Sequence, residues 1–288
     1  MTKKKPLGTK AQMRAEKDKE RRIATAIFLA IILLAAAFSV YFGYTILNSS
    51  PGLSFSGPTL QFKPENPNPD LWAAIVDQVS LTFPNQTFIQ TTTGILEQAN
   101  YSVDYYSGEQ VTVDFYRNLP AHGYKIIILR VHSALFQGNY PPVCLFTSEY
   151  YSKFKYVQEQ LTDSLTSVAF TMQPPYYFGI NPDFVRSSME GKFNSTIVIM
   201  MGCNGLTYTD MAGAFIENGA KAYISWNSSV SAGRTDAATT CLLQHLITEK
   251  QTIEQAVENT MKEVGPDPAC NNTLEYYPLE SGNYAIQR

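Results

Sequence analysis

The sequence is poor in charge and in histidine. Charged residues make up 16% of the 288-residue chain, against about 25% in an average globular protein. Only three histidines and four cysteines are present. There is no glycine-rich phosphate loop, no closely spaced cysteine pair of the zinc-binding type and no Gly-x-Ser-x-Gly motif. These absences argue against a P-loop nucleotidase, a zinc finger and a serine hydrolase built on a nucleophile elbow.

The charges that are present are divided unevenly. Residues 1–22 carry nine Lys or Arg and three acids, for a net charge of +6, and the rest of the chain carries −9. Phosphate binding needs a basic face, so the acidic main body argues against nucleic acid as a partner.

One long stretch has no charge at all. The 25 residues from Ile23 to Leu47 are mostly Ile, Leu, Ala and Phe. At 1.5 Å per residue they can cross a hydrocarbon core of about 30 Å. A cleaved signal peptide has a shorter apolar region and a small-residue cleavage site, and Asn48-Ser49-Ser50-Pro51 is a poor site of that kind. We expect an uncleaved anchor that binds the lipid bilayer.

The basic segment before this anchor predicts the orientation of the anchor in the membrane. The nine bases on its amino side predict a cytoplasmic tail at residues 1–22, a single-pass anchor at 23–47 and an extracytoplasmic body.

Five prolines make residues 48–70 a linker. The body at residues 71–288 carries most of six glycosylation sequons. These sequons begin at Asn48, Asn85, Asn100, Asn194, Asn227 and Asn271.

The pattern of the body predicts strands that alternate with helices. Strands are expected at residues 71–79, 102–106, 125–131, 143–147, 168–172, 196–201 and 222–225. Helices are expected at residues 87–99, 112–119, 151–164, 182–189, 208–218, 235–249 and 252–264. Such alternation predicts an α/β fold, with a mainly parallel central sheet between two helix layers, that is, a three-layer sandwich.

Two of these strands end in reactive side chains. The run Lys-Ile-Ile-Ile-Leu-Arg-Val is followed by His132, and the run Thr-Ile-Val-Ile-Met-Met is followed by Gly202 and Cys203. Both runs are too apolar for either face of the strand to be exposed to solvent, which is typical of central strands in a parallel sheet. Catalytic groups gather beyond the carboxyl ends of such strands. Since an adjacent His can activate a thiol, these residues predict a Cys–His pair. The competing interpretation is a buried thiol and a structural histidine.

A resemblance strengthens the catalytic interpretation. A strand that ends in His, followed about seventy residues later by one that ends in Cys, resembles the caspase-hemoglobinase fold of caspases, gingipain-type peptidases, legumains, separases and CHAT-domain proteins. The later segment is similar to the CHAT pattern. In that pattern a helix ends in Gly-Ala and a short strand then leads to a Trp-containing loop. The matching residues in this sequence are Gly219-Ala220 and Trp226. The resemblance spans Ala73 to Val264 and rests on order and spacing.

The resemblance implies roles for matching residues. Cys203 would be the nucleophile and His132 the general base. The backbone N–H groups of Ser133 and Cys203 would form the oxyanion hole, with Gly202 in support. The loop Ser225, Trp226 and Asn227 would line the substrate pocket. The implied function is a membrane-anchored cysteine endopeptidase that acts on a peptide or protein substrate without a cofactor.

The sequence departs from this family at two positions. Ser133 stands where the family has Gly after its His, and Gly202 stands where it has Ala or Ser. These departures leave a second function open, namely an inactive caspase-like module that binds a partner at the cell surface.

The remaining cysteines and histidines give weaker signals. We expect Cys203 to be free and Cys241 to pair with Cys270, because both of the latter lie outside the central strands. Cys241 and His245 are four residues apart on a predicted helix, a spacing that could hold a metal. Two ligands are too few, and the sequence offers no third nearby, so no metal site is expected.

Overall fold

A computed structural model describes residues 71–135, 142–171 and 173–286. The expected cytoplasmic tail, anchor and linker lie outside these residues. Within the described part, no helix has the length and apolar character needed to span a bilayer.

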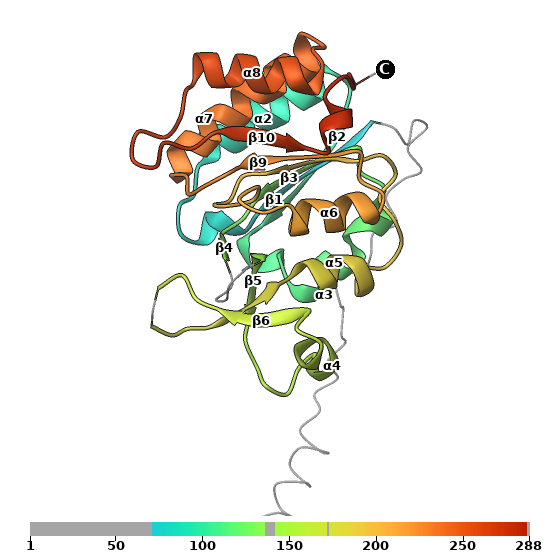
Figure 1. Cartoon of the computed structure of the whole chain (residues 1–288), viewed down its shortest axis with the longest axis vertical. Coiled ribbons are helices and arrows are strands. Elements are labelled where there is room, and N and C mark those ends of the chain that lie inside the picture. Colours follow the sequence, from blue (N-terminus) through green and yellow to red (C-terminus); the bar gives the residue numbers. More distant parts are fainter. Residues whose placement is uncertain (1–70, 136–141, 172, 287–288) are drawn as a thin grey trace, which may run out of the picture. The chain divides into compact units, whose positions relative to one another are not determined.

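Six strands form the central sheet, sheet A (Figure 1). Its order is β10-β9-β8-β3-β1-β2. Five strands run parallel and β10 runs antiparallel to β9. The strands are β1 (Trp72–Asp77), β2 (Ser102–Ser107), β3 (Ile126–Arg130), β8 (Ile197–Met200), β9 (Ala222–Trp226) and β10 (Leu274–Tyr277). The expected α/β class with a mostly parallel sheet is confirmed.

Helices cover both faces of sheet A because alternate strand residues point to opposite sides. Ile126 and Ile128 belong to one apolar cluster, and Ile127 and Leu129 belong to another. The first cluster includes residues of α2 (Gln86–Gln98), α7 (Ala232–Leu243), η4 (Gln244–Thr248) and α8 (Ile253–Glu263). The second includes α3 (Val113–Asn118), α5 (Pro182–Ser187) and α6 (Asp210–Glu217). Figure 1 shows these two helix layers on either side of the sheet.

A second sheet, sheet B, lies beside the layer of α3 and α5 (Figure 1). It is antiparallel, with the order β4-β5-β7-β6. Its strands are β4 (Ser133–Leu135), β5 (Val143–Tyr150), β6 (Leu165–Val168) and β7 (Tyr177–Ile180). The chain enters sheet B immediately after His132, so this sheet begins at the predicted site.

Short helices make the remaining connections. They are η1 (Gln78–Leu81), η2 (Gly108–Gln110), η3 (Leu119–His122), α4 (Val157–Leu161) and η5 (Leu279–Ser281). The helix expected over residues 151–164 is wrong for most of its length, because only α4 forms there. None of the α4 residues is buried, so no apolar face stabilises a longer helix.

Two further expectations need correction. The strand predicted at residues 168–172 lies earlier, at β6, and β7 and β10 were not foreseen. All four cysteines are free, so the predicted Cys241–Cys270 disulfide is wrong. The Cys241 thiol instead lies 3.4 Å from Glu263 Oε2, which places it against α8.

Candidate functional site

The candidate site lies at the carboxyl edge of sheet A, where the strand order changes direction. The chain passes from β1 to β2 on one side and from β3 to β8 on the other. Ligands of open α/β sheets bind beyond the strand ends at such a switch point. The residues that follow β1, β3 and β8 at this edge include Gln78, His132 and Cys203.

His132 is held by the segment that follows β1. Its backbone N–H donates to Gln78 Oε1 at 3.0 Å, and its ring Nε2 lies 2.7 Å from the Thr82 hydroxyl oxygen. Burial lowers the pKa of the His132 imidazole, and the positive charge of Arg130 lowers it further. The ring is therefore neutral at pH 7 and able to accept a proton.

Three aromatic rings surround His132. The ring centroids of Phe170, Phe146 and Phe83 lie 5.0, 6.2 and 6.3 Å from its own. Phe83 is 58% exposed, so this aromatic cluster reaches the surface. The three rings form an apolar surface beside His132 at the edge of the sheet, and an extended ligand could pack against this surface.

Cys203 follows β8 and is half-buried. Its Sγ lies 3.5 Å from both the backbone N and the backbone O of Val230. The Ser133 hydroxyl donates to the Cys203 carbonyl oxygen at 2.6 Å. This hydrogen bond ties the residue next to His132 to the predicted nucleophile.

Gly202 permits this close approach of the two strand ends. A Cβ on Gly202 would lie 2.3 Å from Ser133 Oγ and 2.5 Å from the Val131 carbonyl oxygen. Real Cβ atoms do not come so close to other heavy atoms, so any larger residue would push β8 away from β3.

The structure brings the backbones of His132 and Cys203 to one edge but does not join their side chains. Within the described residues, no hydrogen bond links the imidazole to the sulfur. Nε2 faces Thr82, and Sγ faces the Val230 peptide. Catalytic hydrogen bonds often tighten only when substrate binds, so this separation by itself does not exclude a pair.

The three residues expected to line a substrate pocket lie mostly inside the protein. Ser225 and Trp226 are 0% and 1% exposed. The Ser225 hydroxyl donates to the Met200 carbonyl oxygen at 2.7 Å, and the Trp226 indole donates to Thr235 Oγ1 at 3.0 Å. These side chains supply packing and internal hydrogen bonds.

Asn227, the third of these residues, is less buried. Its side-chain Nδ2 donates to Glu275 Oε1 at 2.7 Å, and this contact joins the end of β9 to β10. Asn227 thus braces the edge strand of sheet A.

A buried charge cluster behind His132 was missed in the sequence. Arg130 is 1% exposed, and its guanidinium contacts Asp77 Oδ1 at 2.7 Å and Asp236 Oδ1 at 2.7 Å. It also donates to the Phe83 carbonyl oxygen at 2.9 Å. Burial raises the pKa of the Asp77 carboxyl, although Arg130 opposes that rise. The cluster ties β1, β3, α7 and the segment that carries Thr82 together.

The signal for this cluster was a single arginine in an otherwise apolar strand. A fully buried Arg needs paired carboxylates. The partners are 53 and 106 residues away in the chain, so spacing could not identify them.

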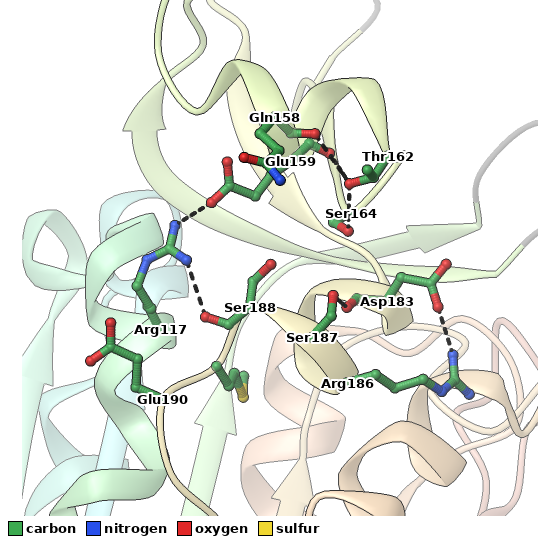
Figure 2. Close-up of a pocket in the computed structure, with 11 residues that line it drawn as sticks. Arg117, Gln158, Glu159, Thr162, Ser164, Asp183, Arg186, Ser187, Ser188 and Glu190 are labelled. Atoms are coloured by element: carbon green, nitrogen blue, oxygen red, sulfur yellow. Dashed lines mark hydrogen bonds and ion pairs between the residues drawn. The ribbon is translucent and has the colours of Figure 1, made fainter.

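A separate hollow of about 750 Å³ lies on the sheet B side. Figure 2 shows Arg117 and Glu159, two of its lining residues, pointing toward one another. Arg117 Nη2 lies 2.7 Å from Glu159 Oε1. Its other arginine, Arg186, pairs with Asp183 at 3.1 Å. Since both guanidinium groups already have carboxylate partners, and no predicted site residue lines the hollow, the strand edge is the better candidate.

No protein-family model and no curated protein matches this chain. Function at the strand edge is therefore inferred from the residues gathered there.

Proposed function

We propose that this chain is a cysteine endopeptidase of the caspase-like type, with Cys203 as nucleophile and His132 as general base. We also propose that it acts at a membrane surface outside the cytoplasm, held there by the stretch from Ile23 to Leu47. The mostly parallel sheet with helices on both faces is compatible with that fold.

The register of β3 and β8 carries the proposal. These strands are parallel neighbours, and their last ladder pair is Leu129 with Met200. His132 lies three residues beyond Leu129, and Cys203 lies three residues beyond Met200. His132 and Cys203 therefore lie the same number of residues beyond the last paired positions of two adjacent strands. Beyond the ladder, the hydrogen bond from the Ser133 hydroxyl to the Cys203 carbonyl oxygen, at 2.6 Å, keeps the two strand ends close.

The reaction would begin with proton transfer from the thiol to the imidazole. The sulfur of Cys203 turns from Val230, loses its proton to neutral His132 and attacks the peptide carbonyl carbon. His132 then gives that proton to the leaving amine as the C–N bond breaks. Water hydrolyses the resulting thioester, with His132 as base again, and restores the free thiol.

Backbone donors are available for the developing oxyanion. Within the described part of the chain, the Cys203 N–H donates to no protein acceptor. His132 O accepts from Phe146 N at 2.9 Å, so Ser133 faces Leu145 at a non-hydrogen-bonded position of the ladder. The Ser133 N–H thus points away from β5, and within the described residues no strand pairs with that side of β4. It is therefore a candidate donor to an oxyanion.

A peptidyl acyloxymethyl ketone probe tests the proposal. We expect one covalent adduct at Cys203 by peptide mass spectrometry, no adduct in Cys203→Ala, and labelling at least about 100-fold slower in His132→Gln, because a general base contributes 10²–10⁴. The matched control is Cys270→Ser, which removes another partly exposed free thiol. Labelling of Cys203 at an unchanged rate in His132→Gln contradicts the pair.

The second candidate is a binding module without catalysis. Ser133 in place of the family's glycine, and the Thr82 hydroxyl on Nε2, favour it. In that case the aromatic cluster of Phe83, Phe146 and Phe170 would hold a peptide that is never cut. Binding of library peptides by the wild-type chain, without cleavage and at the same affinity in Cys203→Ala, would select this function.

A further inference from the structure

We infer that Cys241, His245 and Glu263 form a binding site for a divalent transition-metal ion of the zinc type, separate from the strand edge. One ligand atom from each residue lies within 4.8 Å of the other two. Cys241 is in α7, His245 is one turn later in η4, and Glu263 is the last residue of α8. Helix pairing supplies the third ligand that sequence spacing could not provide.

The His245 ring is buried and faces the cluster with a nitrogen that makes no hydrogen bond within the described residues. The residue is 5% exposed. Its Nδ1 lies 2.9 Å from Glu249 Oε2, a contact that places the ring proton on Nδ1 and leaves a lone pair on Nε2. Nε2 is buried and makes no hydrogen bond within the described residues. A carboxylate that orients the second ring nitrogen in this way is typical of metal-binding histidines.

The contact between Nε2 and Glu263 suits a metal better than a proton. Nε2 lies 3.1 Å from Glu263 Oε1, yet the alignment is not that of a hydrogen bond. Two acceptors at this distance repel each other unless a cation lies between them. A metal ion held by both atoms sits off the line that joins them, whereas a shared proton must sit close to that line.

The distances and ligand types also fit zinc. Bonds of about 2.0 Å to N and O and 2.3 Å to S in a tetrahedral site give ligand separations of about 3.3–3.5 Å. The observed separations are 3.1 Å for Nε2 to Oε1 and 3.4 Å for Sγ to Oε2. A thiol, an imidazole and a carboxylate suit zinc far better than magnesium or calcium. The Glu263 side chain is 61% exposed, which leaves water access to a fourth position.

The surroundings of the thiol are negative, as a cation site requires. The Glu263 carboxylate lies 3.4 Å from Cys241 Sγ, and the Glu249 carboxylate lies 2.9 Å from His245 Nδ1. Both acids keep access to solvent, so an ion can enter without unfolding the helices.

Zinc titration of the detergent-solubilised full chain, carrying no histidine tag, tests the site. We expect one equivalent of Zn²⁺, measured by competition with a chromophoric chelator, and no competition from Mg²⁺. Affinity should fall at least about tenfold in Cys241→Ser and in Glu263→Gln. It should be unchanged in Cys270→Ser and in Glu258→Gln, which alter a free thiol and an α8 carboxylate outside the cluster.

Cobalt provides a second readout that does not depend on affinity. Co²⁺ bound at this site should show a thiolate-to-metal charge-transfer band that disappears in Cys241→Ser and persists in Cys270→Ser. Glu263→Gln changes an exposed side chain, so its far-ultraviolet circular dichroism should match wild type. Three results would overturn the site: no zinc binding by wild type, a zinc affinity in Cys241→Ser and Glu263→Gln equal to that of wild type, or a wild-type cobalt spectrum without the thiolate band.

Discussion

Arg130 is the residue on which the geometry of the strand edge depends most. It lies two positions before His132 and connects Asp77 on β1 with Asp236 on α7. Its sequence neighbours are apolar, and its partners come from distant segments. The placement of His132 and Cys203 at one edge of sheet A could be predicted because each follows a buried strand, and that rule is local. The Arg130 cluster could not, because it depends on which strands become neighbours.

Arg130→Met should destabilise the protein strongly. The substitution leaves the Asp77 and Asp236 carboxylates facing a buried space without a counter-charge, at a cost of about 3–5 kcal/mol. Urea unfolding followed by circular dichroism measures the change. The matched control is Arg186→Met, whose partly exposed ion pairs are worth about 1 kcal/mol or less. Equal losses in the two variants would contradict the structural role of the buried cluster.

The lowered pKa of His132 predicts a pH dependence of stability. The unfolded chain binds more protons than the folded chain below the ordinary histidine value of 6.5. The contribution of His132 is therefore fully present above pH 6.5 and is lost as the pH falls toward the folded pKa. Unfolding free energies between pH 7 and pH 5 should fall less steeply in His132→Gln than in wild type. Parallel curves would show that the folded protein leaves this pKa unshifted.

At the scale of elements, the sequence predicts the parallel core better than sheet B. The central strands are long apolar runs bounded by polar or glycine residues, so burial defines them. Strand β10 is Leu-Glu-Tyr-Tyr at the sheet edge, where only one side pairs and the apolar signal is weak. Strand β7 is a short aromatic segment whose pairing with β5 and β6 is non-local.

Gly202→Ala tests how closely β8 approaches β3. The added Cβ would overlap Ser133 Oγ and the Val131 carbonyl oxygen, so we expect a loss of about 1–3 kcal/mol together with slower labelling of Cys203. The control is Gly94→Ala in α2, where a Cβ meets nothing within 4 Å and helix propensity should add about 1 kcal/mol of stability. Wild-type stability in Gly202→Ala would contradict the tight contact.

At the scale of the whole molecule, the predicted anchor at residues 23–47 precedes all of the described residues in the sequence. Among the described residues, two apolar clusters cover the two faces of sheet A. We therefore expect a fragment of residues 71–288 to fold and remain in solution, and the full chain to sediment with membranes. Protease added outside intact cells should digest the body and spare the basic tail. Recovery of the full chain in the soluble fraction would contradict the anchor.

The central claim is that Cys203 and His132 act together on a peptide bond. Cleavage of a peptide library by the full chain tests it most directly, with products identified by mass spectrometry. The account predicts cleavage by wild type and by Cys270→Ser, and a loss of at least about 100-fold in both Cys203→Ala and His132→Gln. Cleavage that survives Cys203→Ala, or a wild-type chain that cuts no peptide, would contradict it.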